Sequence, residues 1–324
     1  MEAKSLKKII SRLTNWLRHF LTGSFYNRKN VWQAFPAFFD AAAEKTYRVP
    51  GLKKARTLNQ NHESVDCPSM TPQGMTLTEN YLLISAYCYD HRHHSVIYVL
   101  DRQTGIHLKT IPLPDLPHAG GLAYDPIHKK IWISNTAGKH AAVATIHLED
   151  IDNYNELNGP IAYREKVAIK ELPRASAITY DHGYLVVALF SLKTFGQVVC
   201  YPIDEDGALA NPTKKTLVES PYGALAIPQK IQGVTFYKKY LLLSQSWGKQ
   251  PGQIFIFDIQ QTTDFSDPSQ AVKIIDTPPY LEQIYVEDDQ LYTLFESGSS
   301  AYRKKTTLVM KDIFQLDIEK LLDI

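Results

Sequence analysis

The sequence has little of several features that would define a site or a compartment. Its 324 residues include only three cysteines, Cys67, Cys88 and Cys200, and no C-x-x-C pair. This scarcity indicates neither a disulfide framework nor a structural zinc site, so we interpret the cysteines as reduced, half-buried thiols. No stretch of about 18 residues or more is both apolar and uncharged, so no transmembrane helix is predicted.

The chain also lacks an excess of charge of either sign. Lysine and arginine together number 35 and the acidic residues 34, which gives no reason to expect nucleic acid as a partner. The motifs G-x-x-x-x-G-K-[ST], G-x-G-x-x-G, H-E-x-x-H and G-x-S-x-G are absent, which disfavours nucleotide-loop, Rossmann, zincin and α/β-hydrolase mechanisms. With 44% hydrophobic residues, the composition is that of a globular protein with a buried core.

Residues 1–23 have the pattern of a basic amphipathic helix. Apolar side chains recur at helical spacing from Leu6 to Leu21, lysines and arginines lie mainly off that stripe, and Gly23 is a stop signal. Such a helix either packs against its own protein or makes peripheral contact with an anionic membrane through residues 4–21. The segment has neither the uninterrupted apolar run nor the cleavage site of a signal peptide, which favours a cytoplasmic or membrane-peripheral location.

Beyond residue 71, a phrase of two strands recurs five times at a spacing of roughly 50 residues. Its copies begin at Gln73, Gly120, Ser176, Gln232 and Glu282. A third strand with alternating apolar and polar residues follows each copy, and weaker fourth strands follow in four units: HLKTIPL, YREKVAIK, KKTLVE and QAVKII. Four strands at this period are typical of a β-propeller blade. The sequence therefore predicts an all-β fold, a five-bladed β-propeller over residues 71–324.

The fifth unit ends after its third strand, so its outer strand must come from elsewhere. Residues 24–70 are available, and we expect them to wrap the propeller as a lead-in, with a short helical pattern from Trp32 to Glu44. We expect residues 55–64 to supply the closing strand, because closure from the other terminus removes an exposed edge. A six-bladed alternative would require 24–70 to form a whole blade, but the repeated phrase is absent there.

Three motifs are less generic than the repeat itself: HAGGLAYD at 118–125, IQGVTFYKKYLLLSQSWG at 231–248 and LYTLFESGSSAYR at 291–303. With these motifs, the chain from about residue 50 to residue 318 resembles a family of mostly uncharacterised bacterial propeller proteins, many of them secreted. The resemblance implies a fold more than an activity. At the level of architecture alone, the chain is also similar to five-bladed calcium-dependent nucleotidases, in which the first strands contribute to an axial ion site.

The first strands of propeller blades line the central channel, so equivalent positions converge on one axis. The repeat therefore predicts a polar ring made of Gln73, Gly120, Ser176, Gln232 and Glu282, with His118 facing the same side as Gly120. Oxygen atoms around Glu282 suit a divalent cation, Ca²⁺ before others. His118 would instead favour a transition metal or act as a catalytic base. A channel filled only by water is the alternative without function.

The ends of the second strands are expected to form the mouth of this channel. They align as SAY, SNT, ALF, SQS and FES, which places three polar side chains in one register: Asn135, Gln245 and Glu296. Tyr87 and Trp247 would add aromatic walls, and Arg303 a cationic clamp. Asn135 and Gln245 could equally cap blade turns.

Four consecutive residues, His91, Arg92, His93 and His94, follow Asp90 in the first unit. Adjacent side chains diverge in a loop or strand, so at most two of these residues could share one metal ion. We interpret the run as a solvated loop.

These observations support three hypotheses for function. The first is a propeller that binds a small molecule or a metal ion in its central channel. The second is a metal-dependent hydrolase of an ester, lactone or phosphoanhydride, in which Glu282 holds the cation and His118 or Glu296 is the general base. The third is an interaction platform that docks proteins or a membrane through the rim loops and the basic helix.

Overall fold

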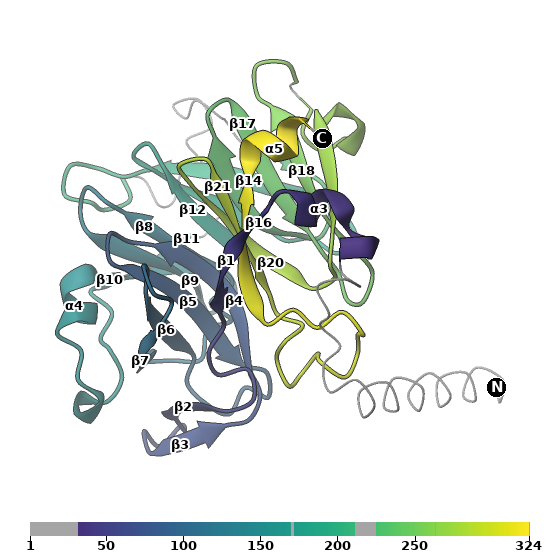
Figure 1. The fold of residues 1–324 in the computed structure, drawn as a ribbon. Coiled ribbons are helices and arrows are strands. Elements are labelled where there is room, and N and C mark those ends of the chain that lie inside the picture. The colour runs from purple at the N-terminus through teal and green to yellow at the C-terminus, as the bar shows by residue number, and fades with distance from the viewer. Residues whose placement is uncertain (1–31, 170–171, 211–224, 263, 324) are drawn as a thin grey trace, which may run out of the picture.

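The computed structural model describes residues 32–169, 172–210, 225–262 and 264–323, and the basic helix expected at 1–23 lies outside them. Within these residues the chain forms five four-stranded antiparallel sheets and one two-stranded sheet (Figure 1). The five larger sheets are arranged in a ring as a five-bladed β-propeller, because the innermost strand of each sheet contacts the innermost strand of the next and the fifth contacts the first. The five-bladed prediction is confirmed, and the six-bladed alternative is wrong.

In blades 1 to 3 the strands follow one another in chain order from the axis outward. Blade 1 contains β4 (Met70–Leu77), β5 (Tyr81–Cys88), β6 (Val96–Asp101) and β7 (His107–Pro112). Blade 2 contains β8 (Leu122–Asp125), β9 (Lys130–Ala137), β10 (His140–His147) and β11 (Glu165–Ile169). Blade 3 contains β12 (Ala177–Asp181), β13 (Tyr184–Leu189), β14 (Gly196–Pro202) and β15 (Leu225–Ile227). The stretch KKTLVE, expected as the outer strand of blade 3, falls outside the described residues, and β15 takes that place.

Blades 4 and 5 complete the ring. Blade 4 contains β16 (Ile231–Tyr237), β17 (Tyr240–Gln245), β18 (Gly252–Asp258) and β19 (Lys273–Thr277). Blade 5 contains β20 (Leu281–Glu287), β21 (Gln290–Phe295), β22 (Asp312–Asp317) and β1 (Ala42–Arg48). Short helical segments lie between or beyond the strands: α3 (Pro36–Asp40), α4 (Leu148–Asp152), η1 (Glu156–Asn158), η2 (Pro268–Gln270) and α5 (Ile318–Asp323). Among the described residues, no helix has the length and apolar character needed to cross a bilayer.

The N-terminal strand β1 closes the ring. It pairs antiparallel with β22, and Figure 1 shows it in purple beside the yellow strands of the C-terminal blade. The expectation that residues 55–64 would donate this strand is wrong, because β2 (Ala55–Leu58) pairs instead with β3 (Ser64–Cys67) as a hairpin. The helical pattern also ends earlier than expected, at Asp40, and the buried Phe38 and Phe39 of α3 pack against Phe314.

The inner strands approach each other so closely that one level of the axis has almost no room for side chains. A Cβ atom on Gly74 would lie 2.8 Å from the backbone of Gly121. The position next in line on blade 5 is Gln283, whose buried side chain crosses to three other blades. Its Oε1 accepts the N–H groups of Met75 and Leu122, both at 2.9 Å, and its Nε2 donates to the carbonyls of Leu122 and Ile178 at 2.8 and 3.0 Å.

Gln283 therefore occupies the axis where a continuous channel was expected. The cavities found at the two ends of the inner strands share no lining residue. The end at which the inner strands begin holds all the polar residues expected at the axis, and the other end is lined by residues such as Thr179, Thr235 and Glu287.

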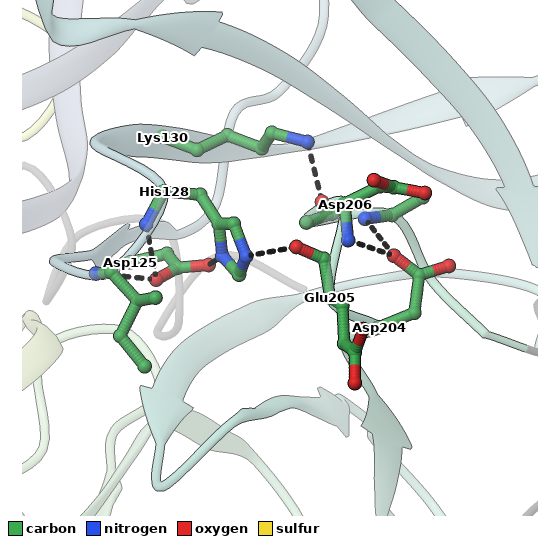
Figure 2. Close-up of polar contacts among 9 residues, drawn as sticks. Asp125, His128, Lys130, Asp204, Glu205 and Asp206 are labelled. Atoms are coloured by element: carbon green, nitrogen blue, oxygen red, sulfur yellow. Dashed lines mark hydrogen bonds and ion pairs between the residues drawn. The ribbon is translucent and has the colours of Figure 1, made fainter.

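A network of polar contacts, partly buried, joins blade 2 to blade 3 (Figure 2). Asp125 is fully buried, and its carboxylate accepts the N–H of Ile127 at 2.9 Å and faces His128 Nδ1 at 2.6 Å. The other ring nitrogen of His128 faces the carbonyl of Glu205 at 3.2 Å, and Lys130 donates to the nearby carbonyl of Gly207. The turn between β8 and β9 is thereby tied to the loop that follows β14.

Candidate functional site

Two adjoining cavities lie at the end of the axis where the inner strands begin. Their volumes are about 470 and 680 Å³. Five residues line both cavities: Gln73, His118, Gln232, Trp247 and Glu282. We treat the two cavities as one site, which we call the axial pocket. Its size is within the range of small-molecule sites.

β-bulges direct three of the expected axis residues into the axial pocket. The pairing of inner and second strands shifts between Pro72 and Gly74 in blade 1, and again between Ile231 and Gly233 in blade 4. A third shift in blade 5 lies between Leu281 and Ile284. A bulge leaves a residue without a cross-strand partner and turns its side chain away from the regular alternation. The residues released in this way include Gln73, Gln232 and Glu282.

Two glutamates form the floor of the axial pocket. Glu282 and Glu296 are 4% and 8% exposed and lie close enough for each to affect the pKa of the other. Burial raises the pKa of Glu296 to about 8. Burial also raises the pKa of Glu282 well above its ordinary value, and the neighbouring Glu296 raises it further. The pair therefore retains protons at neutral pH that two exposed carboxyls would lose.

Two glutamine amides extend the polar floor around this carboxyl pair. Gln73 Nε2 donates to Glu296 Oε2 at 3.0 Å, and Gln232 Nε2 faces Glu282 Oε1 at 3.5 Å. For a divalent cation, Glu282 and Glu296 would supply carboxylate oxygens and the two amides would supply carbonyl oxygens after rotation of the side chain. Both carboxyls would have to lose their protons, so cation binding at this floor would compete with protonation.

Aromatic side chains form the walls. The ring centroids of Tyr87 and His118 lie 4.2 Å apart, and those of Tyr280 and Tyr302 lie 5.0 Å apart. Trp247 packs near Phe190 but remains 51% exposed at the mouth of the axial pocket. These faces are suited to packing against flat apolar faces of a ligand, while the floor offers hydrogen-bonding groups.

His118 is a neutral side chain in this setting. His118 remains exposed at the axial pocket, where desolvation by the surrounding protein lowers its pKa, and the charges of His91 and Arg174 act in the same direction. At neutral pH the imidazole is therefore uncharged, so one ring nitrogen is free to accept a proton. This is compatible with the role of general base expected from the sequence.

The repeat alignment treated Asn135, Gln245 and Glu296 as equivalent positions, but it is wrong by one residue in the fifth unit. Phe295 is the cross-strand partner of Leu281, just as Gln245 is the partner of Ile231. Glu296 is therefore one step beyond the level of Gln245. Since successive side chains on a strand point to opposite faces, a slip of one residue changes the face. Glu296 thus lies in the axial pocket, while the Gln245 amide donates to the carbonyl of Gln229 at 2.7 Å.

Three other predicted residues have partners of their own. Asn135 lines the rim of the larger cavity, but its amide faces Tyr163 Oη at 3.1 Å. Ser176 also lines the larger cavity, and its hydroxyl accepts the N–H of Phe190 at 3.0 Å. Arg303 is not the expected clamp on a ligand. Its guanidinium donates to the carbonyls of Leu52 and Gly298 and so fastens the lead-in to the loop after β21.

The sequence reasoning missed several residues that line the axial pocket, chiefly Tyr280, Tyr302 and Lys305. Tyr302 and Lys305 belong to the long connection between β21 and β22, where the Lys305 ammonium lies 4.5 Å from the Tyr302 ring centre. The unusual length of this connection, compared with the short turns of the other units, was the available signal. A long loop after a second strand starts at the mouth of the axis and has room to fold over it.

No family model matches the chain, and no curated protein matches it by sequence. Solved structures that match include a nidogen/laminin complex at 14% identity, covering 77% of this chain and 84% of that one, with a TM-score of 0.44. A GH43_1 enzyme from Xanthomonas citri complexed with xylose matches at 12% identity, covering 86% and 91%, with a TM-score of 0.45. The periplasmic gluconolactonase of Pseudomonas aeruginosa matches at 14% identity, covering 67% and 61%, with a TM-score of 0.39. These likenesses are too remote to bear on an activity, and the resemblance to a bacterial propeller family stays a prediction.

Proposed function

We propose that this propeller binds a small polyhydroxy compound, of about the size of a sugar, in the axial pocket. The observation that carries the proposal is the pair of buried carboxyls, Glu282 and Glu296, at the floor of a cavity with aromatic walls. Buried carboxyls and amides need partners that both donate and accept, and hydroxyl groups do both. The C–H faces of a sugar ring would pack against Tyr87 and Trp247.

A divalent cation, Ca²⁺ first, is the second candidate occupant. It is favoured by the carboxyl of Glu282 and the two amides that the bulges direct to the floor, together with the carboxyl of Glu296 just after the end of β21. Because a cation would displace the protons of Glu282 and Glu296, its affinity should rise between pH 6 and pH 9. The affinity of an uncharged polyol should not rise in this way.

Hydrolysis of an ester, lactone or phosphoanhydride is a third possibility at the same site. It is favoured by a carboxyl that keeps its proton near neutral pH, Glu296, and a neutral imidazole, His118, which line the same cavity and offer a proton donor and a proton acceptor. A cation held by Glu282, with Glu296 keeping its proton, would supply Lewis-acid chemistry to such a reaction.

The test is a binding screen on the full chain. Tryptophan fluorescence and calorimetry would follow titration with monosaccharides, disaccharides, sugar lactones and CaCl₂, with the products of any turnover measured separately. Gln232→Ala removes a floor amide, and Gln245→Ala is the matched control, since both glutamines belong to blade 4 and only Gln232 lines the axial pocket. We expect Gln232→Ala and Glu296→Gln to weaken binding by about tenfold or more, or about 1.4 kcal/mol, and Gln245→Ala to leave it unchanged.

Either of two results would contradict the proposal. One is a panel in which no compound binds saturably. The other is binding that Glu296→Gln and Gln232→Ala leave as strong as in the unmodified protein. Saturable binding of CaCl₂ alone, with an affinity that rises with pH, would favour the cation instead.

A further inference from the structure

Three side chains with metal-binding atoms meet at the end of the second strand of blade 1, just after the axial-pocket residue Tyr87. Cys67 is the last residue of β3, Cys88 is the last residue of β5, and His93 lies in the loop between β5 and β6. The two sulfur atoms and a ring nitrogen all lie within 4.8 Å of one another, and Cys88 Sγ is 3.3 Å from His93 Nδ1. No short sequence motif predicts this group, because its three residues are brought together only by the pairing of β2 with β3 and of β4 with β5.

The surroundings hold these groups in place. Cys67 and Cys88 are 0% and 1% exposed, while His93 is half-buried and leaves one side of the cluster near solvent. Ser69 Oγ lies 3.7 Å from Cys67 Sγ and 3.6 Å from Cys88 Sγ, and it donates to Asp90 Oδ2 at 2.7 Å. A carboxylate and a hydroxyl therefore stand just behind the thiols, as outer-shell groups commonly do at metal sites.

The spacing suits a tetrahedral ion. With Zn–S bonds of about 2.3 Å and Zn–N bonds of about 2.0 Å, tetrahedral geometry separates the ligand atoms by roughly 3.5–3.8 Å. The observed separations require only small side-chain movements to reach these values. Two thiolates and an imidazole select zinc over calcium or magnesium, which prefer oxygen ligands.

We propose that Cys67, Cys88 and His93 bind one Zn²⁺ ion through two thiolates and Nδ1, with water at the fourth position. Two S–Zn bonds form as each sulfur binds as a thiolate, any proton still held by the pair passes to solvent, and no oxidation state changes. The ion would tie the β2–β3 hairpin of the lead-in to blade 1. None of these three residues lines the axial pocket.

The test uses the reduced, metal-free full chain under inert gas, with Co²⁺ as a spectroscopic substitute for Zn²⁺. We expect one equivalent of Co²⁺ to produce a thiolate-to-cobalt charge-transfer band and the visible bands of a tetrahedral ion. Both signals should disappear when Zn²⁺ is added. Cys88→Ser should abolish the charge-transfer band from that thiolate and weaken binding, whereas Cys200→Ser, which changes a buried cysteine of blade 3, should change neither.

His93→Gln keeps the test decisive if a cysteine variant does not fold, because His93 is in a half-buried loop and Gln is of similar size. We expect this variant to retain the circular dichroism of the native chain and to bind Zn²⁺ more than about tenfold more weakly. The proposal fails if the native chain shows no saturable cobalt spectrum. It also fails if His93→Gln binds as tightly as the native chain, or if protein purified with Zn²⁺ carries a Cys67–Cys88 disulfide.

Discussion

At the scale of single residues, burial changes what a carboxyl can do. Glu282 and Glu296 come from the inner strand and the second-strand end of the same blade, and folding removes both from water. The charged form of a carboxyl loses its hydration on burial, so the protonated form is favoured. Desolvation acts with the opposite result on His118, where it lowers the pKa and favours the uncharged imidazole.

The raised pKa of Glu296 predicts a pH dependence of folding stability. An unfolded glutamate titrates near pH 4.3, whereas burial raises the pKa of Glu296 to about 8 in the folded chain. Between these values the folded state binds more protons than the unfolded state. The stabilising contribution is therefore complete below about pH 4 and is lost as the pH rises through about 8.

Glu296→Gln should remove this dependence. Urea unfolding at pH 5, 6, 7 and 8 should show that the native chain loses up to about 1.4 kcal/mol per pH unit more than the variant does. Glu44→Gln is the control, since Glu44 is exposed on β1. A native chain whose stability is flat over this range, or a Glu296→Gln variant with the same slope, would contradict the prediction.

At the scale of elements, the blades are held together by specific polar contacts as well as by apolar packing. Asp125 and His128 at the turn of blade 2 reach the loop after β14 in blade 3. A similar pair, Asp181 and His182, occupies the corresponding turn of blade 3. The His128 side chain is 21% exposed and the His182 side chain 85% exposed, so solvent screens the second pair far more.

This difference predicts unequal effects of the same substitution. His128→Ala should lower the free energy of unfolding by about 1–2 kcal/mol, because it removes two hydrogen bonds and leaves the buried Asp125 carboxylate with one partner fewer. His182→Ala should cost less than about 0.5 kcal/mol, as exposed pairs usually do. Chemical denaturation of both variants measures the difference, and equal losses would show that the contact with blade 3 contributes nothing.

At the scale of the whole molecule, the ring depends on β1 to join the two ends of the chain. Tyr47 is the buried residue of this strand, opposite Ile313 of β22, and its hydroxyl donates to the carbonyl of Arg102 in blade 1 at 2.7 Å. One side chain therefore contacts both the last and the first blade. An open ring would expose the edge of β22, and closure removes that edge.

Tyr47→Ala should therefore destabilise the whole propeller rather than one blade. We expect a loss of about 3–5 kcal/mol in the free energy of unfolding, because the substitution empties a large buried site at the junction. Tyr47→Phe should lose only about 1 kcal/mol, since it removes the hydrogen bond and keeps the packing. Thermal unfolding followed by circular dichroism and by tryptophan fluorescence checks both, and an Ala variant as stable as the Phe variant would contradict the role in closure.

Much of the fold could be predicted from the sequence because propeller blades are local units. Strand alternation and a repeat of roughly 50 residues require only contacts between neighbours in the chain. The same repeat correctly set Gln73, Gln232 and Glu282 level, since each is the bulge residue of its inner strand. The position of Glu296 along the axis could not be predicted in this way. In the fifth blade, the pairing of the inner and second strands differs by one residue from the pairing that the aligned repeats suggest.

The repeat in the sequence was enough to predict the five units, their inner strands, and the approach of Gln73, Gln232 and Glu282 to the axis. The closure of the ring by β1, the position of Gln283 across the axis, and the meeting of Cys67, Cys88 and His93 became visible only in the folded chain. The difference lies in the range of the interactions involved. The repeat in the sequence reflects contacts within one blade. Ring closure, the hydrogen bonds of Gln283 and the cluster of Cys67, Cys88 and His93 depend on contacts between segments far apart in the chain, which no local pattern describes.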